Sequence, residues 1–530
     1  MTAIQRVTLV ATGLGLFMIF LDAMIVNVGL PAIQADFHVG EAGLQWVVTG
    51  YSLGMAVTIM SAATFADLYG RRKLYFASVA VFTVSSLACG MSGSLGMLTA
   101  ARVVQGIAAA ATNVTSLALV SAAFPEPKAK ARAIGIWTAI ASSATALGPT
   151  LGGVLVETLS WRAIFLVNLP VGIAVLALTW RYVAESRDNR PRQFDIPGQL
   201  LFIVTVGAFA YAVIEGPHDG WASLPILTLL GVALVGAAAF ILTETRSADP
   251  MMDLALFRDR TYTLAIGAIF VMFFAIYGML LVVTQYLQNV RGHSPAVTGA
   301  LLLPFSILCT TVSLRVGVMI GRTGTRFPIL LGLGLTIAGF LALVIGMSGS
   351  PVLISIGIGL CGAGGGFCLT PITSLAMSAV PAERAGMASG IMSAQRAIGS
   401  TVGFAVMGSI LAGWLGATLD RDLAAALPDP VERREVSQVI VAHANPHAYV
   451  AEIGPGRPIT HAQPQVRQAI LAAADADFIA GIRTALAVAT VFLVAVFVLG
   501  YVRFPRGMGG IADARSEAAK IEAEEGARGG

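Results

Sequence analysis

The feature that most constrains this chain is a succession of apolar runs, each about 20 residues long. The 530 residues are 56% hydrophobic and only 12% charged, and their mean hydropathy is +0.80. A helix of about 20 apolar residues crosses the hydrocarbon core of a bilayer, because it rises about 1.5 Å per residue. Soluble proteins carry about 25% charged residues and do not sustain such runs. We therefore predict an all-α polytopic membrane protein.

Hydropathy windows of about 19 residues predict fourteen transmembrane helices. Their ranges are 8–28, 44–66, 74–93, 97–124, 131–157, 163–183, 196–216, 223–243, 262–288, 297–320, 328–347, 351–379, 387–415 and 479–502. The first run is too long for the apolar part of a cleavable signal peptide, and no small-residue cleavage site precedes Pro31. The range 416–478 is predicted to be a long outer loop, and the polar tail 503–530 is predicted to be cytosolic.

The distribution of basic residues predicts the orientation, because Lys and Arg are enriched in cytoplasmic loops. The short loops on one side hold only Arg162 and Arg291, so we expect that side to face outward and both termini to be cytosolic. The residues gathered on the cytosolic side are Arg6, Arg71, Arg72, Lys73, Lys128, Lys130, Arg132, Arg181, Arg187, Arg190, Arg192, Arg246, Arg258, Arg260, Arg322, Arg326 and Arg384.

The chain also repeats itself at an offset of about 255 residues. Thr115–Ala118 and Thr373–Ala376 share the sequence TSLA, and Gly148 corresponds to Gly403. The repeat divides the chain into a six-helix half at 1–183, an inserted helix pair with linkers at 184–261, and a second half at 262–502 that contains the outer loop. Both halves begin on the same side, so the repeat is parallel. Secondary transporters are built from such halves, with the substrate site near the midplane.

Asp22 is a carboxylate within an otherwise apolar helix. An acid at the bilayer centre costs roughly 2.5–3.5 kcal/mol on insertion scales, and burial favours its neutral form. The other acids near the predicted helices, such as Asp67, Glu157 and Glu244, fall at helix ends, and all six His residues fall in outer loops. Asp22 is therefore a candidate for binding and releasing a proton. The alternative is a structural acid paired with Arg102, and both can hold at once.

Two arginines fall well inside predicted helices. Arg102 lies some five residues inside its helix and needs an acid or carbonyl partner there, unless its side chain reaches back to the surface. Arg396 follows Gln395 midway along a later helix and is a weaker candidate of the same kind. Arg315 is closer to a cytosolic loop, so we expect it to reach the surface.

The loop Asp67–Arg72 combines an aspartate, Gly70 and the arginines Arg71 and Arg72. Gly70 permits a tight turn, and Asp67 can pair with arginines or with a helix N-terminus of the other half. Such a charge cluster can act as a cytosolic gate that is made in one conformation and broken in another. Anchoring of the loop by positive charge alone would explain the arginines but not the aspartate.

A further pattern, Gly148-Pro149-x-x-Gly152-Gly153, interrupts a predicted helix. Proline kinks a helix, and small residues allow a neighbouring helix to approach closely. The pattern predicts a bent, tightly packed interface that limits proton leakage. General small-residue packing is the alternative.

These motifs together resemble those of the major facilitator superfamily, in its fourteen-helix drug:proton antiporter branch (the EmrB/QacA type), and within it the multidrug exporters of mycobacteria. The motifs are Leu21-Asp22-x-x-x-Val26-Asn27-Val28-x-x-Pro31, Asp67-x-x-Gly70-Arg71-Arg72, Arg102-x-x-Gln105-Gly106, Gly148-Pro149-x-x-Gly152-Gly153 and Trp161-Arg162-x-x-Phe165-x-x-Asn168-x-Pro170. The resemblance implies proton coupling at Asp22, an intramembrane polar motif at Arg102, Gln105 and Gly106, and an antiporter motif at the glycines and proline. Ala63, Leu68 and Ala144 depart from the residues usual in these motifs.

We therefore expect a proton-coupled exporter of amphipathic drugs in a bacterial cytoplasmic membrane. Its partners would be protons, a drug-like molecule and lipids, with no cofactor and no obligate protein partner. Export of an endogenous lipid or metabolite on the same scaffold is the alternative. No lysine follows a glycine, which argues against an ATP-driven pump, and we find no nucleophile–base constellation or sensor-sized domain that would indicate an enzyme or receptor.

Two other partner classes are disfavoured. The net charge of +4 is too small and scattered for a nucleic-acid surface. His443 and His447 are separated by Asn445 and Pro446, which argues against an unbroken helix that would present both as metal ligands, and the four cysteines form no CxxC pair.

Overall fold

The protein is helical throughout the part that its computed structural model describes. That part comprises residues 1–124, 126–186, 195–247, 250, 252–380, 385–443 and 464–504, and it contains no β-strand. Twelve helices in these ranges are long and apolar enough to cross a membrane. The prediction of an all-α polytopic protein is therefore confirmed.

The helices follow one another with short connections. The first half contains α1 (Ala3–Phe37), α2 (Glu41–Tyr69), α3 (Arg71–Gly90), α4 (Leu95–Ala123), α5 (Pro127–Thr158), α6 (Ala163–Leu166) and α7 (Asn168–Tyr182). Next come α8 (Ile196–Asp219), α9 (Leu224–Arg246) and the 3₁₀ turn η1 (Leu254–Arg258). The remainder contains α10 (Arg260–Gln285), the π-helical turn η2 (Tyr286–Val290), α11 (Pro295–Thr323), α12 (Arg326–Gly346), α13 (Pro351–Ser378), α14 (Ala385–Asp422), η4 (Leu423–Ala425), α15 (Pro430–His443) and α17 (Pro464–Arg503).

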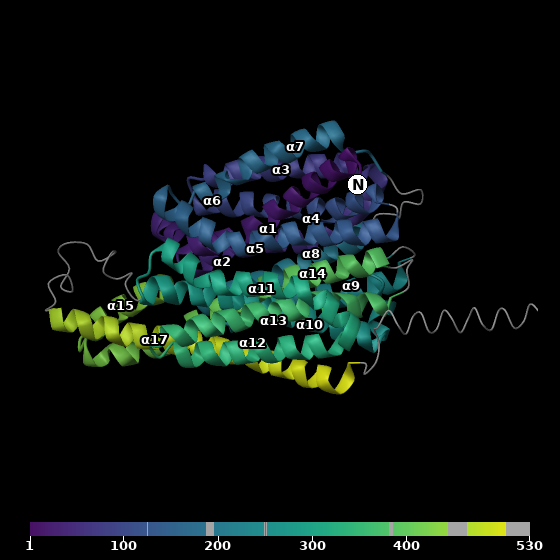
Figure 1. Ribbon diagram of the computed structural model, residues 1–530. Coiled ribbons are helices and arrows are strands. Elements are labelled where there is room, and N and C mark those ends of the chain that lie inside the picture. Colours follow the sequence, from purple (N-terminus) through teal and green to yellow (C-terminus); the bar gives the residue numbers. More distant parts are fainter. Residues whose placement is uncertain are drawn as a thin grey trace, which may run out of the picture.

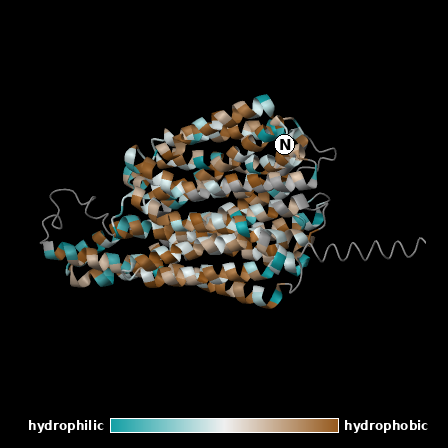
Figure 2. Cartoon of the chain, in the orientation of Figure 1, coloured by the Kyte–Doolittle hydropathy of each residue, from teal (hydrophilic) through white to brown (hydrophobic). Residues whose placement is uncertain are grey.

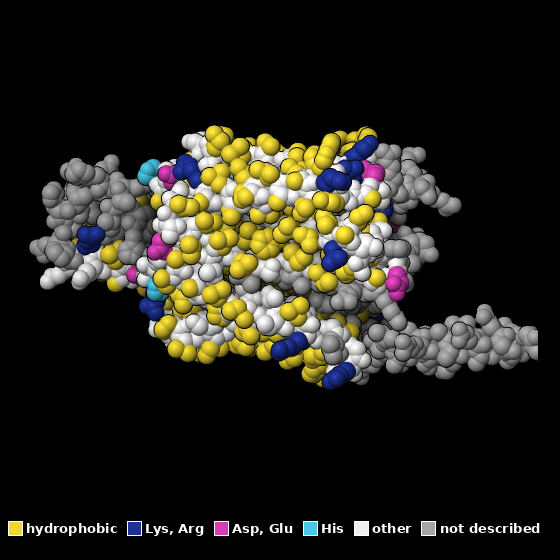
Figure 3. Space-filling view, turned by 45° about the horizontal axis from the view of Figure 1, so that its top comes forward, with side chains coloured by type: hydrophobic (Ala, Val, Ile, Leu, Met, Phe, Trp, Pro, Cys, Tyr) yellow, Lys and Arg dark blue, Asp and Glu magenta, His cyan; other side chains and the backbone are white. Residues whose placement is uncertain are grey.

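The long helices run roughly parallel or antiparallel in one bundle (Figure 1). Helices α1 to α7 lie in one part of the bundle and α10 to α17 in the other, with the N-terminus at one end and α15 at the opposite end. The helices are hydrophobic along much of their length and carry most of their hydrophilic residues near their ends (Figure 2). On the face shown in Figure 3, hydrophobic side chains fill the middle of the molecule, as expected for a surface in contact with lipid.

The repeat in the sequence reappears in the packing. Gly148 of α5 lies against α1, where an added Cβ would be 2.6 Å from the Cβ of Met24. Gly403 of α14 lies in the same way against the backbone of Phe274 in α10. Both glycines therefore allow the first and fifth helices of their repeats to approach closely, since any side chain would separate them.

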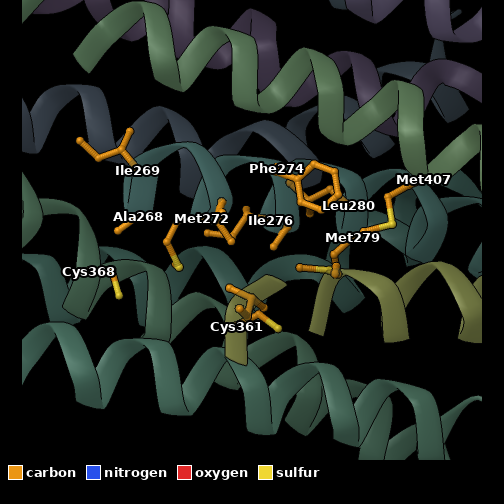
Figure 4. Packing of buried hydrophobic residues seen from close by; sticks show 14 of the residues in the cluster. Ala268, Ile269, Met272, Phe274, Ile276, Met279, Leu280, Cys361, Cys368 and Met407 are labelled. Carbon is orange, nitrogen blue, oxygen red and sulfur yellow. The ribbon is translucent and has the colours of Figure 1, made fainter. Parts of the chain in front are cut away.

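Helix α10 is the centre of the largest hydrophobic cluster. Its residues Met272, Ile276 and Met279 are buried and belong to the same cluster as Cys361 of α13 (Figure 4). A helix that is apolar on all sides is typical of the inside of a bundle. The cluster gives the second half a continuous core.

The inserted helix α8 is attached to both repeats by polar contacts. The indole of Trp46 in α2 donates to Glu215 over 2.9 Å, and Ser61 of α2 bonds with Gln199. The hydroxyl of Ser409 in α14 donates to the carbonyl of Val213 over 2.6 Å. Helix α8 therefore bridges α2 and α14.

Of the fourteen segments predicted to span the membrane, twelve correspond to the helices that meet the length and hydropathy criteria in the described residues. The other two are α2 and α5, which have 29 and 32 residues. The predicted helix 163–183 consists of the short α6 followed directly by α7.

The predicted outer loop 416–478 differs most from the structure. Helix α14 continues to Asp422, α15 follows, and α17 already begins at Pro464. With 40 residues, α17 is about 60 Å long, roughly twice what a bilayer requires. Asp477, predicted to lie in the loop, is therefore inside a helix, and it is buried. Hydropathy windows missed these helices because their apolar residues alternate with charged ones.

The end of α14, helix α15 and the beginning of α17 pack around a separate apolar cluster. Its members are Leu419, Leu423, Leu427, Val436, Ile440, Ile470 and Ala474. This cluster lies at the end of the molecule that carries α15, apart from the bundle core (Figure 1).

We predict that Ile440→Ala loosens this cluster, because Ile440 is fully buried there. Truncation of a buried Ile costs about 2–5 kcal/mol. Hydrogen exchange of Pro430–His443 should accelerate. The control is Val431→Ala in the same helix, whose side chain is 67% exposed and whose truncation should change little. Equal exchange in both variants would contradict a packed cluster.

Candidate functional site

The candidate site is built around Asp22, which is 0% exposed in the middle of α1. Arg102 of α4 is 1% exposed and forms an ion pair with it through Nη1. The two residues predicted to bear buried charge are thus in direct contact. Breaking such a pair would leave an uncompensated charge in an apolar interior, which is costly.

Both carboxylate oxygens of Asp22 accept hydrogen bonds. Oδ2 accepts from Arg102, and Oδ1 accepts from the amide of Gln105 over 2.9 Å and from the amide of Asn168 over 2.8 Å. The side-chain oxygen of Gln105 in turn accepts from Arg102 over 2.7 Å. The donors compensate for the desolvation of the carboxylate, because hydrogen bonds to its charged form stabilise that form.

A second layer orients these donors. The hydroxyl of Ser86 in α3 accepts from Gln105 over 2.7 Å. Nε of Arg102 donates to the carbonyl of Val47 over 3.1 Å, and its guanidinium lies 4.3 Å from the ring centroid of Tyr51, both in α2. Helices α1, α2, α3, α4 and α7 therefore all contribute to one polar centre.

The arrangement can hold either a charged or a protonated carboxyl. While Asp22 is ionised, the ion pair with Arg102 is neutral overall and fully buried. Addition of a proton to Asp22 would remove one charge and leave the guanidinium with its carbonyl and ring contacts. The charge of Asp22 therefore sets how strongly α1 and α4 attract one another.

Sequence reasoning did not assign Asn168, Ser86 or Tyr51 to this site. Asn168 occurs in a motif of the resemblance but carries no charge that would single it out. Ser and Tyr are common in membrane helices, because their polar groups can bond to the backbone or to neighbouring helices. A polar residue on the buried face of α7 is the one signal that would have indicated Asn168.

Gly106, the last residue of the intramembrane motif, allows two helices to pack closely. It lies directly against the backbone of Tyr51, so that a Cβ at this position would overlap with α2. The close approach of α4 and α2 brings Arg102 within reach of Val47.

The proposed cytosolic gate lies far from this centre. Gly70 has a φ of 104°, which favours glycine, and it ends α2. The backbone N–H groups of Arg72 and Lys73 donate to Glu185 over 3.0 and 3.3 Å, and that of Arg71 donates to the carbonyl of Ser186. The side chain of Asp67 lies outside the described residues. Glu185 was not anticipated from the sequence, because it follows α7 in a polar segment.

The antiporter motif lies on both faces of α5. Gly148 and Gly152 contact α1 at Met24 and Ile25, whereas Gly153 contacts Pro295 and Ala296 of α11. Pro149 is opposite Gly299 of α11, which has no room for a side chain. The motif therefore joins the two halves near the end that carries α15.

Arg396 is half-buried in α14, next to the half-buried Gln395. Its Nη2 donates to the hydroxyl of Thr373 in α13 over 2.8 Å, and its guanidinium lies 5.9 Å from the ring centroid of Phe273. Arg315 is exposed on α11, as predicted.

A metal site is not indicated. The predicted exclusion of His443 and His447 concerns side chains outside the described residues. Where side chains are described, no group of three or more His, Cys, Asp or Glu residues could hold a metal ion.

Comparisons with known proteins agree with this architecture. The family model described as Major Facilitator Superfamily matches residues 12–404. The chain is 60% identical over 506 residues to "Multidrug resistance protein Stp" of Mycobacterium tuberculosis, covering 96% of this chain and 93% of that protein. It is 45% identical to "Drug efflux pump JefA" of the same species, covering 96% and 99%. A bacterial homologue of the human lysosomal transporter Spinster has a similar fold, with a TM-score of 0.61, 17% identity and coverage of 96% and 100%.

We predict that Arg102→Gln destabilises the protein more than the double variant with Asp22→Asn does. Removal of one partner of a buried pair costs about 3–5 kcal/mol, because the other charge stays buried and unpaired. The double variant removes both charges and should recover much of the loss. Thermal unfolding of the purified variants completes the cycle. Additive losses would mean that the two side chains do not interact.

Proposed function

Because the chain belongs to the Major Facilitator Superfamily, we propose that it exports drug-like molecules across a bacterial cytoplasmic membrane in exchange for protons. The chain is a multi-pass membrane transporter and not an enzyme. Two relatives that match nearly its whole length are described as a multidrug resistance protein and a drug efflux pump. The observation that carries the proton-coupled part of the proposal is the buried contact between Asp22 and Arg102.

The buried pair suits proton exchange for an electrostatic reason. Proton binding to Asp22 converts a neutral ion pair into an isolated cation at Arg102, and in an apolar interior this changes the balance of forces considerably. A conformation that hydrates Arg102 or supplies another acceptor then becomes favourable. Proton uptake and conformational change are linked in this way, whichever occurs first.

Asn168 offers an acceptor for the added proton. Its side-chain oxygen is buried and has no hydrogen-bond partner among the described residues, while its Nδ2 donates to Asp22. Rotation of the amide by half a turn would present that oxygen to a protonated Asp22. Asn168 would then donate to the ionised form and accept from the neutral form, so that neither state leaves Asp22 without a partner.

The finer topology is also part of the proposal. Helices α2 and α5 are long enough to cross the bilayer and pack against the spanning helices α4 and α1. Counting them, and taking α6 with α7 as one span, gives fourteen spans, with α8 and α9 as the inserted pair. The distribution of basic residues then puts both termini in the cytoplasm and α15 outside.

Alternating access would follow from movement of the two halves against one another. The contacts of α5 with α11 include Gly153, Pro149 and Glu157, which lie towards the outer end. Towards the inner end of α11, added side chains at Gly317 and Gly321 would meet open space. The motif at 148–153 would thus act as the outer closure, and the loop with Gly70, Arg71 and Arg72 as part of the inner one. Gln105 and Gly106 would keep Arg102 in place.

The driving force needs no cofactor. One charge that moves through 100 mV supplies about 2.3 kcal/mol, enough for roughly fifty-fold accumulation of a substrate. One acid at the centre suggests few protons per cycle, and the described residues place no further carboxylate there to bind a dication. We therefore propose neutral, zwitterionic or monocationic amphipathic substrates.

We predict that Asp22→Asn abolishes proton-driven transport, because asparagine cannot bind and release a proton. The measurement is uptake of a fluorescent drug into inverted membrane vesicles, with and without a proton ionophore. Wild-type uptake should fall with the ionophore, and the variant should remain at the ionophore level. Active transport that survives both changes, or export of a divalent cation by the variant, would contradict the mechanism. A second measurement uses a strain from which the gene is deleted. Drug export as in the wild-type strain, together with an abnormal lipid profile, would favour an endogenous substrate.

We predict that Gly299→Val opens a proton leak, because its side chain would overlap with Pro149 and hold α5 and α11 apart. The leak is measured as decay of a pH gradient in proteoliposomes without substrate. The control is Gly317→Val in the same helix, where an added Cβ meets nothing within 4 Å. The outer closure would be misassigned if both variants kept the gradient as well as the wild type.

A further inference from the structure

The second half of the bundle contains a cationic side chain, Arg396, that takes no part in the proposed proton cycle. We propose that Arg396, held by Thr373 and lying near Phe273, whose ring stacks with Tyr277, binds the carboxylate or a similar anionic group of an aromatic substrate. This inference rests on the proposed export function and narrows its substrate class to zwitterions, which carry such an acceptor.

The environment of Arg396 contrasts with that of Arg102. Arg102 has a carboxylate, a carbonyl and an amide oxygen as acceptors. Among the described residues, Arg396 has one acceptor, the hydroxyl of Thr373, and its buried Nε has none. No acidic side chain in the described ranges pairs with it. A guanidinium carries five N–H donors, so most of its donors are available.

An unpaired cation inside a membrane protein is costly, and such residues mark substrate or ion pathways. Water can hydrate Arg396 while the site is empty, since its side chain is only half-buried. A carboxylate matches the planar fork of a guanidinium in a bidentate manner, which neither water nor the single Thr373 oxygen does. A substrate that brings a carboxylate would therefore supply the missing partner.

The neighbouring rings indicate the rest of the substrate. Phe273 and Tyr277 follow one another on one face of α10, with ring centroids 5.7 Å apart and an interplanar angle of 17°. Both side chains are half-buried, in contrast to the fully buried residues between them. Tyr277 is supported from the side by Phe404, whose ring is nearly perpendicular to it at 5.8 Å. Two parallel, partly accessible rings beside a cation suit a flat aromatic molecule with an acidic group.

The polar residues close to this site support the same assignment. Gln395 precedes Arg396 and is also half-buried. Thr373 belongs to α13 and Arg396 to α14, so their hydrogen bond crosses between two helices and sets the direction of the guanidinium. Both helices belong to the half that lacks Asp22.

The test compares two dyes that differ in one group. Rhodamine B carries a carboxylate, and its ethyl ester does not. Binding to the purified full-length protein is measured by fluorescence anisotropy. Loss of a hydrogen-bonded charge pair corresponds to about tenfold or more in affinity. We expect the wild type to prefer rhodamine B by at least that factor and Arg396→Gln to lose the preference, with unchanged affinity for the ester.

Two further variants make the result specific. Arg315→Gln removes an exposed cation from the same half and should leave the preference intact. Thr373→Val removes the hydroxyl that orients the guanidinium, and it should weaken binding of rhodamine B but not of the ester. It also provides the comparison if Arg396→Gln does not yield folded protein by size-exclusion chromatography.

The proposal is overturned if the wild type binds both dyes equally, or if Arg396→Gln weakens both to the same extent. Transport is assayed separately in proteoliposomes with an imposed pH gradient. A preference that depends on Arg396 without proton-driven movement of either dye would support the binding site and contradict the exporter. Proton-driven movement of both dyes without the preference would support the exporter and contradict the binding site.

Discussion

The first half of this protein depends on one buried ion pair. Asp22 and Arg102 are almost completely inaccessible and lie in the apolar interior of a helix bundle. Such a pair is favourable only when its geometry is good and the remaining donors and acceptors are satisfied. Here that requirement brings side chains or carbonyls from α1, α2, α3, α4 and α7 to one point. The packing of five helices is thus tied to the charge state of one carboxyl.

The two halves share a repeat but not this pair. Gly148 and Gly403 occupy equivalent positions and allow the same close contact between the first and fifth helices of each repeat. The second half places an arginine, Arg396, among aromatic rings and without a carboxylate in the described residues. A common scaffold therefore carries two different electrostatic sites. One is balanced internally, and the other has no acidic partner among the described residues.

The sequence predicted those features that one large free-energy contribution decides. Long apolar runs predicted the helices, because the bilayer leaves few alternatives, and the cost of buried charge identified Asp22 and Arg102. Weaker interactions, such as single hydrogen bonds between polar side chains, could not be assigned from the sequence. Asn168 and Ser86 resemble many other polar residues in membrane helices. Glu185 is far from Arg72 in the sequence, and the packing of the helices brings the two together. Helix α15 and the first part of α17 were missed because their amphipathic pattern has little mean hydropathy.

Close packing explains how one carboxyl can act on the whole molecule. Within each half, helices meet at glycines such as Gly106 and Gly403, where backbones touch and no side chain can yield. Packed interiors of this kind transmit strain and do not deform gradually. Between the halves, α5 and α11 meet in the same way at Gly153 and Gly299. A change in attraction between α1 and α4 that the packed interior does not absorb would act on the interface between the two halves. That interface is where a transporter has to move.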